Sequence, residues 1–361
     1  MAASRTPRPT RAESGISSPP ELVAGELPAA LSLDHFHPAL PLAVALSGGA
    51  DSMALLLACA TRWPGQVHAL HVHHGLQAAA DDFAAHCQYW CERWSVPLHT
   101  VYVDARADEG QSPEEAARVA RYQAIAQAVQ QHCPQVRDVA LAQHADDQIE
   151  TMLLALSRGA GLPGLSGMPA SLQRHGLNFH RPWLAVAGQQ LRDWLTQCQV
   201  GWVEDPTNQD VRYTRNRVRH TLMPALEACF PSFRQTFARS ARHAAQAQAL
   251  LDDLAALDAQ RCGLPPRLPE LRELTAERMA NLLRYWLQSQ ELAMPSQERL
   301  QAWWRDLITA KVDAKLEWAH DDQKIYLWRG MLQVGHPQEG YWALKTLPVN
   351  SKQLGFPADW I

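Results

Sequence analysis

Residues 46–53 have the sequence LSGGADSM, in which two adjacent glycines, two serines and an aspartate separate two apolar runs. Gly48 and Gly49 allow a tight turn that gathers successive backbone N–H groups in one concavity, and such a concavity binds anions. A helix that begins near Asp51 would add its N-terminal dipole, so a phosphate group is the natural ligand. Asp51 would repel phosphate unless a divalent cation such as Mg²⁺ lay between them. The stretch therefore predicts a phosphate site, and the competing interpretation is an ordinary capped turn.

A second group of chemically active residues lies in the sequence QHADDQIET, residues 143–151. Asp146 is expected to be the N-cap of a helix. Glu150 follows four residues later, so both carboxylates face the same side of that helix, and Asp147 lies three residues before Glu150. Three neighbouring acids repel one another, so we expect a metal ion or a cationic substrate to compensate them. A solvated acidic helix start is the alternative.

Two arginines follow a well-specified helix start at residues 112–122, SPEEAARVARY. Ser112 is the expected N-cap, Pro113 occupies the first helical position, and Glu115 completes a capping box. Arg118 and Arg121 are three residues apart and suit a carboxylate or a phosphate ligand. Ordinary surface arginines would give the same pattern.

Basic residues concentrate in residues 171–250, which carry 10 Lys or Arg and 5 Asp or Glu, whereas residues 41–170 carry 7 and 13. The stretch VRYTRNRVRH (211–220) suits backbone phosphates and a stacked base of a nucleic acid. A solvated basic face is the alternative. The residues predicted for this contact are Arg212, Tyr213, Arg215, Arg217 and Arg219.

Histidines and glycines near these groups have less specific interpretations. His71 and His73 share one face of a predicted strand, and His144 precedes the acidic helix. Their spacing fits no standard zinc pattern, so hydrogen-bonded histidines beside the site are favoured over a metal centre. Residues 158–168, RGAGLPGLSGM, contain too many glycines for a helix and are predicted to form a loop.

Alternating strands and helices must position these residues. Strands are expected at 42–47, 67–74, 98–104 and 136–142, and helices near 52–61, 77–94, 113–131 and 147–157. This order predicts an α/β fold, a parallel sheet with helices on both faces and ligands at the carboxyl ends of the strands. After about residue 230 a long helix (238–260), a break (262–271) and a mostly helical second domain with a strand pair (315–330) follow, with a boundary near 240–250.

Bulk properties exclude several classes of protein. The chain has 361 residues, of which 47% are apolar and 19% charged, as in ordinary globular proteins. It has no apolar run long enough to span a membrane and no secretory signal, so a cytoplasmic protein is expected. Seven cysteines without a CxxC pair argue against disulfides and against a thiolate zinc site. The net charge of −4 argues against a uniformly basic surface.

The motifs, taken together, resemble a known family. SGG-x-DS after the first strand looks like the PP-loop of the ATP-pyrophosphatase superfamily. Six further segments stand in the order of the tRNA(Ile)-lysidine synthetase family: HVHHGL, EEAARVARY, QHADDQIET, RGAGLPGLSGM, RPW and WVEDPTNQDVRYTRNRVR. The resemblance covers residues 42–225, and a weaker similarity covers residues 240–335.

This resemblance implies a domain organisation. Residues 1–40 would be a mostly disordered leader, 41–240 the PP-loop ATPase catalytic domain and 241–335 a mostly helical tRNA-contacting domain. Residues 336–361 would be a tail, because the further C-terminal domain of longer family members is expected to be absent. A homodimer is one option for the oligomeric state, which the sequence leaves open.

The resemblance also implies an activity. ATP would adenylate the C2 oxygen of the wobble cytidine of tRNA(Ile) with a CAU anticodon, and the ε-amine of free L-lysine would then displace AMP. The product, lysidine, changes codon reading from AUG to AUA and charging from Met to Ile. Another PP-loop enzyme that thiolates tRNA, an ammonia-using relative and a non-catalytic tRNA-binding relative are the alternatives. Cysteines without paired spacing and the missing glutaminase domain argue against the first two.

Residue roles follow from the same resemblance. Asp146, Glu150 and Arg118 would hold the lysine and, with Asp51, form the catalytic group. Asp51 or Asp147 would hold Mg²⁺. The residues implied for ATP binding are Ser47, Gly48, Gly49, Ala50, Asp51, Ser52, Val72 and His73.

Overall fold

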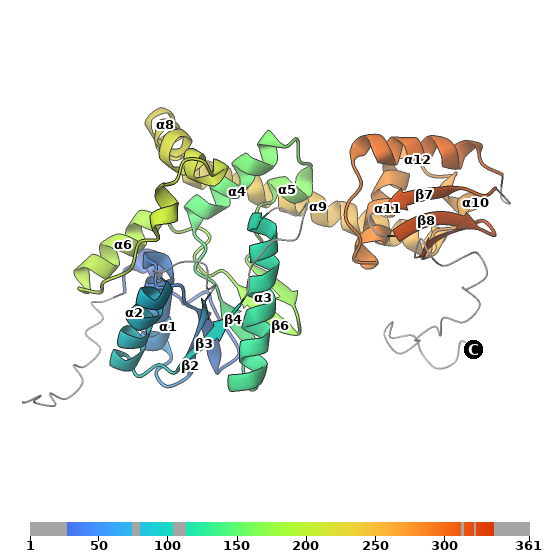
Figure 1. Cartoon of the computed structure of the whole chain (residues 1–361). Coiled ribbons are helices and arrows are strands. Elements are labelled where there is room, and N and C mark those ends of the chain that lie inside the picture. The colour runs from blue at the N-terminus through green and yellow to red at the C-terminus, as the bar shows by residue number, and fades with distance from the viewer. Residues whose placement is uncertain (1–26, 74–79, 104–112, 312–313, 321–322, 336–361) are drawn as a thin grey trace, which may run out of the picture. The chain divides into compact units, whose positions relative to one another are not determined.

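The structure is a computed structural model that describes residues 27–73, 80–103, 113–311, 314–320 and 323–335 (Figure 1). The chain divides into two compact units, Met1–Ala245 and Gln246–Ile361. None of the helices in the described part of the chain has the length and apolarity needed to cross a bilayer.

A six-stranded sheet forms the centre of the first unit. The strand order is β3-β2-β1-β4-β6-β5, and all neighbours are parallel except β5 and β6. The predicted parallel sheet is thereby confirmed, with an antiparallel edge hairpin that the sequence analysis missed. The strands are β1 (Leu42–Ala45), β2 (Val67–His73), β3 (Leu98–Tyr102), β4 (Asp138–Ala140), β5 (Ser171–Arg174) and β6 (Leu177–His180).

Helices cover both faces of this sheet, as Figure 1 shows for α1 and α2 on one side and α3 on the other. Alternate residues of β1 explain the two layers: Leu42 and Val44 pack in the core with α1, α2 and α6, whereas Ala43 packs in the core with α3. Because both faces are buried, the strand is apolar throughout. The helices are α1 (Ala50–Arg62), α2 (Ala80–Arg93), α3 (Pro113–His132) and α6 (Gly188–Gln197).

The strand order reverses direction between β1 and β4, because β2 follows on one side of β1 and β4 lies on the other. Ligands of such sheets bind at this switch point, outside the carboxyl ends of the strands. The loop at residues 46–49 follows β1, and α4 (Ala145–Ser157) follows β4. The topology therefore brings the glycine pair and the acidic helix to one crevice. Beyond α4, the predicted loop at 158–168 contains one helical turn, α5 (Leu162–Leu165).

The predicted leader is too long, because residues 27–40 are part of the folded unit. Leu31 and Leu33 are 0% and 2% exposed and belong to the main core. The Trp183 indole N–H donates to the Leu31 carbonyl at 3.2 Å, and the Ala39 N–H donates to Asp138 at 2.7 Å. These contacts connect the segment to β4 and to the chain after β6. Residues 1–26 lie outside the described part.

Replacing Leu31 with alanine is expected to destabilise the first unit by about 2–5 kcal/mol, the usual cost of such a cavity in a packed core. Leu40, which is 44% exposed, provides the matched control, and Leu40→Ala should change stability little. Urea unfolding followed by tryptophan fluorescence measures both. Equal, small effects of the two substitutions would show that the segment does not contribute to the core.

The second unit packs helices against a small sheet. Its core contains Trp286 and Leu287 of α11, Trp303 of α12 and Ile325 of β8. The antiparallel order β7-β8-β9 includes one strand more than the predicted pair. The elements are the C-terminal part of α9 (Phe233–Cys262), α10 (Leu268–Leu271), α11 (Ala276–Ser289), α12 (Gln297–Thr309), β7 (Glu317–His320), β8 (Gln323–Trp328) and β9 (Met331–Gly335).

Candidate active site

The glycine loop after β1 is held in an anion-binding conformation. Gly48 has φ +86°, and a Cβ there would lie 3.2 Å from the Cys87 sulfur, so this position requires glycine. Gly49 is the N-cap of α1 and has no side chain with which to cap it, which leaves the first N–H groups of the helix available to a ligand.

Ser52 shapes this loop from within. It is buried, its hydroxyl donates to the Gly49 carbonyl at 3.0 Å, and it accepts from the Ser47 N–H at 3.1 Å. The two serine hydroxyls are 3.0 Å apart. Ser52 thus fixes the loop conformation. The exposed Ser47 hydroxyl and the main-chain N–H groups remain to donate to a ligand.

The acidic helix α4 begins two residues earlier than predicted. Its N-cap is His144 rather than Asp146: the His144 Nδ1 accepts from the Asp146 N–H at 3.2 Å, and the Asp147 carboxylate accepts from the His144 N–H at 3.1 Å. The prediction failed because an imidazole nitrogen performs here the capping usually done by Asp, Asn, Ser or Thr. Asp146 is thereby free to direct its carboxylate into the crevice.

His144 connects the glycine loop to the acidic helix. Its Nε2 lies 3.3 Å from Asp51 and 3.5 Å from Asp147. Burial lowers the pKa of His144, but the hydrogen bond to Asp51 and the charges of Asp147 and Asp146 outweigh burial and raise it to about 9. The bond from the Asp146 N–H, by contrast, is that of an imidazole whose Nδ1 carries no proton. In the charged imidazolium and in the neutral tautomer alike, Nε2 carries a proton that points toward Asp51.

The Asp51 carboxylate has two properties expected of a cation ligand, a lowered pKa and a buried oxygen without a hydrogen-bond partner among the described residues. Burial raises the pKa of this carboxyl, yet the hydrogen bond from His144 and nearby positive charges lower it below its ordinary value. The Asp51 Oδ1 atom is buried and has no hydrogen-bond partner among the described residues. A buried, charged oxygen of this kind requires a positive partner.

Arginines of the chain itself compensate the other two carboxylates. Glu150 is 0% exposed and accepts from the Nε atoms of Arg215 and Arg219, each at 2.8 Å. Asp146 accepts from Arg234 Nε at 2.6 Å and from the Gly188 N–H at 2.9 Å. The three neighbouring acids predict a metal ion or a cationic substrate as the compensating charge, but arginines that are distant in sequence supply much of it.

Gly188, the first residue of α6, is required by the same contacts. A Cβ at this position would lie 2.8 Å from the His144 ring and 3.1 Å from the Asp146 carboxylate. Real Cβ atoms do not approach so closely, so any side chain here would displace the two residues that organise the crevice.

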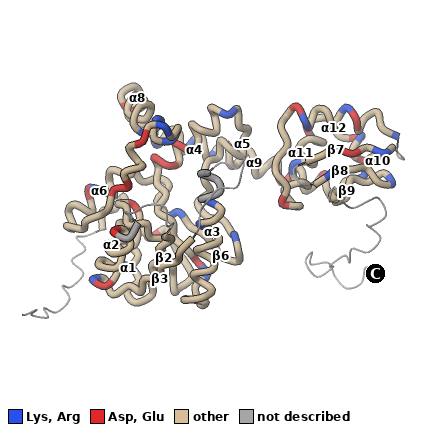
Figure 2. The backbone as a smooth tube through the Cα atoms, in the orientation of Figure 1, with Lys and Arg blue, Asp and Glu red and all other residues tan. Residues whose placement is uncertain are grey.

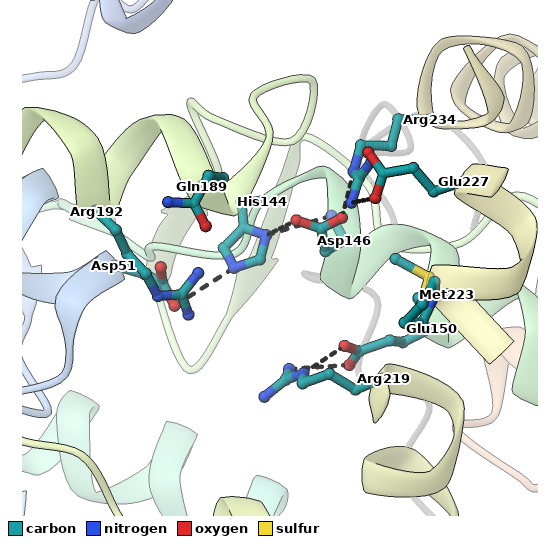
Figure 3. Close-up of a pocket in the computed structure, with 11 residues that line it drawn as sticks. Asp51, His144, Asp146, Glu150, Gln189, Arg192, Arg219, Met223, Glu227 and Arg234 are labelled. Atoms are coloured by element: carbon teal, nitrogen blue, oxygen red, sulfur yellow. Dashed lines mark hydrogen bonds and ion pairs between the residues drawn. The ribbon is translucent and has the colours of Figure 1, made fainter. Parts of the chain in front are cut away.

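A polar pocket of about 200 Å³ is lined by several of the residues described so far, namely Asp51, His144, Asp146, Glu150, Arg219 and Arg234 (Figure 3). Figure 3 shows Arg192 and Gln189 beside Asp51 on one side of His144, with Arg234 and Glu227 beyond Asp146 on the other. The pocket is small compared with the roughly 300–1,000 Å³ of sites for drug-sized ligands. The lining residues that the sequence analysis missed are Gln189, Arg192, Met223, Pro224, Glu227 and Arg234.

The predicted nucleic-acid stretch divides into two groups. Arg215 and Arg219 point to Glu150, as described, and their side chains are 33% and 35% exposed. Arg212 pairs with Asp210 at 2.7 Å, and Arg217 donates to the main-chain carbonyls of Val211 and Arg212. Figure 2 shows basic and acidic positions close together between α8 and α4. The stretch therefore both pairs with the acids of α4 and contributes to the surface. Tyr213 is 57% exposed.

A π-helical turn accounts for the arginine geometry. α7 (Thr214–Arg217) continues into a π turn at Val218–Leu222 and then into α8 (Met223–Cys229). Arg215 and Arg219 are four residues apart and project to one side across this turn. Such turns occur frequently at functional sites.

The remaining predicted residues lie around the crevice or away from it. Val72 and His73 end β2 beyond the last register pair of β1, Ala45 with Leu70, so their main chain adjoins the glycine loop. Arg118 is exposed on α3 and does not line the pocket. Burial lowers the pKa of Arg181, and the charge of Arg118 lowers it further, against the raising effect of Tyr122. Ser112 and Glu115 fall outside the residues whose side chains are described.

His71 is satisfied by the main chain, because its Nδ1 lies 2.9 Å from the Leu46 carbonyl. Arg181, from the RPW segment, is also a structural residue: it is buried and donates to Tyr122, Gln143 and the Pro169 carbonyl. It thereby anchors the chain that leads from β4 into α4.

Comparisons with known proteins agree with this geometry. Residues 29–226 match the model of the PP-loop domain, and residues 267–333 match the model of the TilS substrate binding domain. The tRNA(Ile)-lysidine synthase of Polaromonas naphthalenivorans is 59% identical over 262 residues, which cover 73% of this chain and 79% of that protein. The tRNA(Ile)-lysidine synthase of Bordetella pertussis is 40% identical over 307 residues, which cover 81% and 95%.

A solved structure is more remote. The U34-tRNA thiolase NcsA of Methanococcus maripaludis is 15% identical, with a TM-score of 0.48, and the match covers 56% of this chain and 70% of that one. At this distance the likeness does not favour thiolation over lysidine formation. The two domain models and the two curated relatives do discriminate, and they show that this chain belongs to the tRNA(Ile)-lysidine synthase family.

Proposed function

We propose that this chain forms lysidine on tRNA(Ile) with a CAU anticodon, in two steps at one site. The C2 oxygen of the wobble cytidine attacks the α-phosphorus of ATP, and pyrophosphate leaves. The lysine ε-nitrogen then attacks C2, the C2–O bond breaks, and AMP departs. Besides the family, the observation that carries this proposal is the position of His144, whose Nε2 lies within 3.5 Å of both Asp51, at the start of α1, and Asp147 of α4.

The glycine loop would bind the triphosphate of ATP. Amide groups at Gly48, Gly49 and Ala50 suit phosphate oxygens, because the loop and the start of α1 present N–H donors together with a helix dipole. Main-chain groups of Val72 and His73 would contact the adenine. The family's use of ATP supports this assignment.

The acids at the crevice fit a magnesium ion. Asp51 offers a buried oxygen without a partner among the described residues, and Asp147 lies close enough to share His144 with it. Carboxylate oxygens are the ligands that Mg²⁺ prefers. When bound, the ion would neutralise phosphate charge, and His144 would then orient both carboxylates.

The acids of α4 would bind and activate lysine. A free amine has a pKa of about 10.4, so the neutral nucleophile costs roughly 4–5 kcal/mol at pH 7. A carboxylate can hold the ammonium group and accept its proton during attack. The side chain of Asp146 is 18% exposed whereas that of Glu150 is 0% exposed, which favours Asp146 as the proton acceptor and Glu150 as the residue that holds Arg215 and Arg219.

Arginines would complete the substrate contacts. Arg192 and Arg234 line the pocket and are better placed for the lysine carboxylate than Arg118, which would act from the exposed surface of α3. Arg212, Tyr213 and Arg217 would contact tRNA directly. Arg215 and Arg219 would contact tRNA only if they also kept their hydrogen bonds to Glu150 or gave them up.

The proposed function is tested with ATP, labelled lysine and tRNA(Ile) transcripts that differ only at the wobble base. Label should enter the tRNA only when that base is cytidine, and pyrophosphate and AMP should appear in equal amounts. Label that enters irrespective of the wobble base, or pyrophosphate release without any lysine transfer, would contradict the proposal.

Gly188→Ala is expected to reduce lysidine formation by about 10²-fold, because an angstrom-scale displacement of catalytic groups has effects of this size. Gly201→Ala is the control, since a Cβ there would lie 3.7 Å from the His86 ring, an ordinary contact. Steady-state lysine incorporation measures both variants. Equal activities would show that the close approach of Gly188 to His144 is not required.

A further inference from the structure

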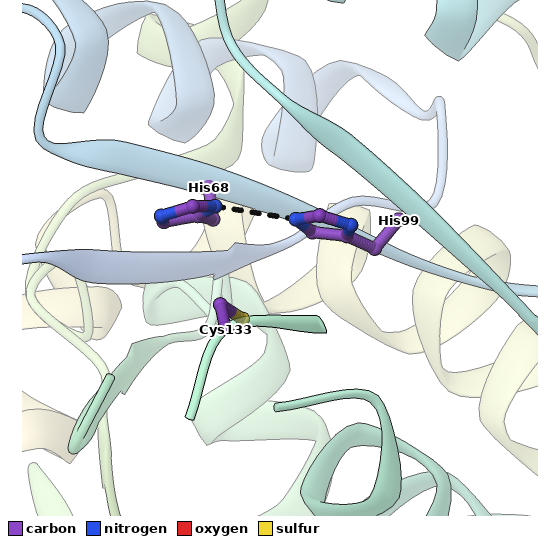
Figure 4. Close-up of side chains that lie close together, drawn as sticks. All are labelled: His68, His99 and Cys133. Carbon is purple, nitrogen blue, oxygen red and sulfur yellow. Dashed lines mark hydrogen bonds between the residues drawn. The ribbon is translucent and has the colours of Figure 1, made fainter. Parts of the chain in front are cut away.

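A second cluster of side chains that could bind a metal ion lies at the N-terminal ends of the strands, whereas the pocket lies at their C-terminal ends. His68 and His99 are the second residues of β2 and β3, and Cys133 directly follows α3. Because β2 and β3 are parallel, their first residues lie at the same edge, away from the carboxyl ends that form the active site. Figure 4 shows the two imidazoles side by side with the cysteine nearby.

The distances within this cluster suit one metal ion. His68 Nδ1 and His99 Nε2 are 3.2 Å apart, and one ring nitrogen of each histidine and the Cys133 sulfur all lie within 4.8 Å of one another. Tetrahedral zinc, with Zn–N of about 2.0–2.1 Å and Zn–S of about 2.3 Å, places its ligand atoms about 3.4–3.7 Å apart. The two nitrogens, 3.2 Å apart, are slightly closer than this spacing, so an ion would require a small separation of the rings and an adjustment of the Cys133 side chain.

Neighbouring groups hold the imidazoles in place. The His132 ring stacks on His99, with centroids 5.1 Å apart and planes 7° apart. The Gln135 amide lies 3.5 Å from the other ring nitrogen of His68, so after an amide flip its oxygen could accept from that nitrogen. Metal-ligating histidines regularly have such a partner, which fixes the ring orientation. Cys133 is 0% exposed, so its sulfur is protected from other thiols.

We propose that His68, His99 and Cys133 bind a transition-metal ion of the zinc class, with a fourth position open to water. Imidazole nitrogen and thiolate sulfur are both ligands that zinc binds, and the thiol loses its proton to solvent when the ion binds. The bound ion would connect the starts of β2 and β3 to the end of α3. The absence of closely spaced cysteines argues against a thiolate zinc site, but these ligands come from three separate parts of the chain, which such spacing does not reveal.

Titration of the full chain with Co²⁺, after removal of metals with a chelator, tests this proposal. One Co²⁺ per chain should produce a near-ultraviolet thiolate-to-cobalt charge-transfer band and the strong visible bands of a tetrahedral ion, and Zn²⁺ should abolish both. Cys133→Ser should remove the charge-transfer band. His99→Gln, at a half-buried position, should weaken Co²⁺ binding at least tenfold. Cys229→Ser, which removes an exposed thiol, is the control and should leave the bands unchanged.

The Co²⁺ titration contains no ATP, lysine or tRNA, so its result does not depend on whether the proposed activity is correct. Absence of the charge-transfer band from the wild-type chain, or its persistence in Cys133→Ser, would overturn the proposal. Circular dichroism of each variant reports its folding. If Cys133→Ser does not fold, the comparison of His99→Gln with Cys229→Ser decides, since equal Co²⁺ affinity in the two would equally overturn it.

Discussion

Asp146→Asn is expected to abolish lysidine formation while ATP binding remains measurable. Asparagine has nearly the shape of aspartate and can still accept from the Gly188 N–H, which lies 2.9 Å from the wild-type carboxylate. It cannot, however, take a proton from the attacking amine, and positioned proton transfer contributes about 10²–10⁴-fold in rate. Adenylation should persist, so AMP-linked tRNA should accumulate when lysine is present.

Asp253→Asn, at an exposed position of α9, is the control for this substitution and should have wild-type activity. Rapid-quench measurement of adenylated tRNA and of lysidine separates the two steps. Lysidine formation at the wild-type rate in Asp146→Asn would exclude Asp146 as the proton acceptor and leave Glu150 or Asp147 for that role.

Asp51→Asn is expected to eliminate the first step instead. The substitution removes the charged, buried oxygen that lacks a partner among the described residues, and with it a magnesium ligand. Loss of one preorganised electrostatic partner at a reacting centre costs about 10²–10³-fold, and loss of the ion would cost more. Pyrophosphate release that depends on tRNA is the measurement.

The same substitution should lower the pKa of His144, because the hydrogen bond to Asp51 is the largest influence that raises it to about 9. The imidazole resonances in an NMR titration would report this change. Unaltered pyrophosphate release in Asp51→Asn would contradict the assignment of Asp51 to the nucleotide, whatever the pKa of His144.

The positions of the glycine loop and of the acidic helix could be predicted from the sequence. Both follow short apolar strands, and parallel strands bring their carboxyl ends to one edge. Local patterns therefore sufficed to place Asp51 near Asp146, although the strand order was not known.

The partners of these acids could not be predicted in the same way. Arg234 is 88 residues from Asp146, and Arg219 is 69 residues from Glu150, and a lone arginine has the same sequence pattern on a surface as in a pocket. The arginines at 211–220 suggested a surface for nucleic acid because charge along a sequence does not reveal which side chains turn inward.

Two further differences have local causes. Leu31 and Leu33 belong to the core, but they lie in a Pro- and Ala-rich segment without a regular period, which is typical of disordered chain. The edge hairpin β5–β6 was missed because its strands, SLQR and LNFH, are short and partly polar, and only β6 is flanked by another strand on each side.

The most direct test of the central proposal is a crystal structure of the chain with a non-hydrolysable ATP analogue, Mg²⁺ and lysine. The polyphosphate is expected within hydrogen-bond distance of the Gly48, Gly49 and Ala50 amides, with the lysine ε-nitrogen at the Asp146 carboxylate. A nucleotide bound away from this loop, or a lysine amine that contacts none of the α4 acids, would contradict it.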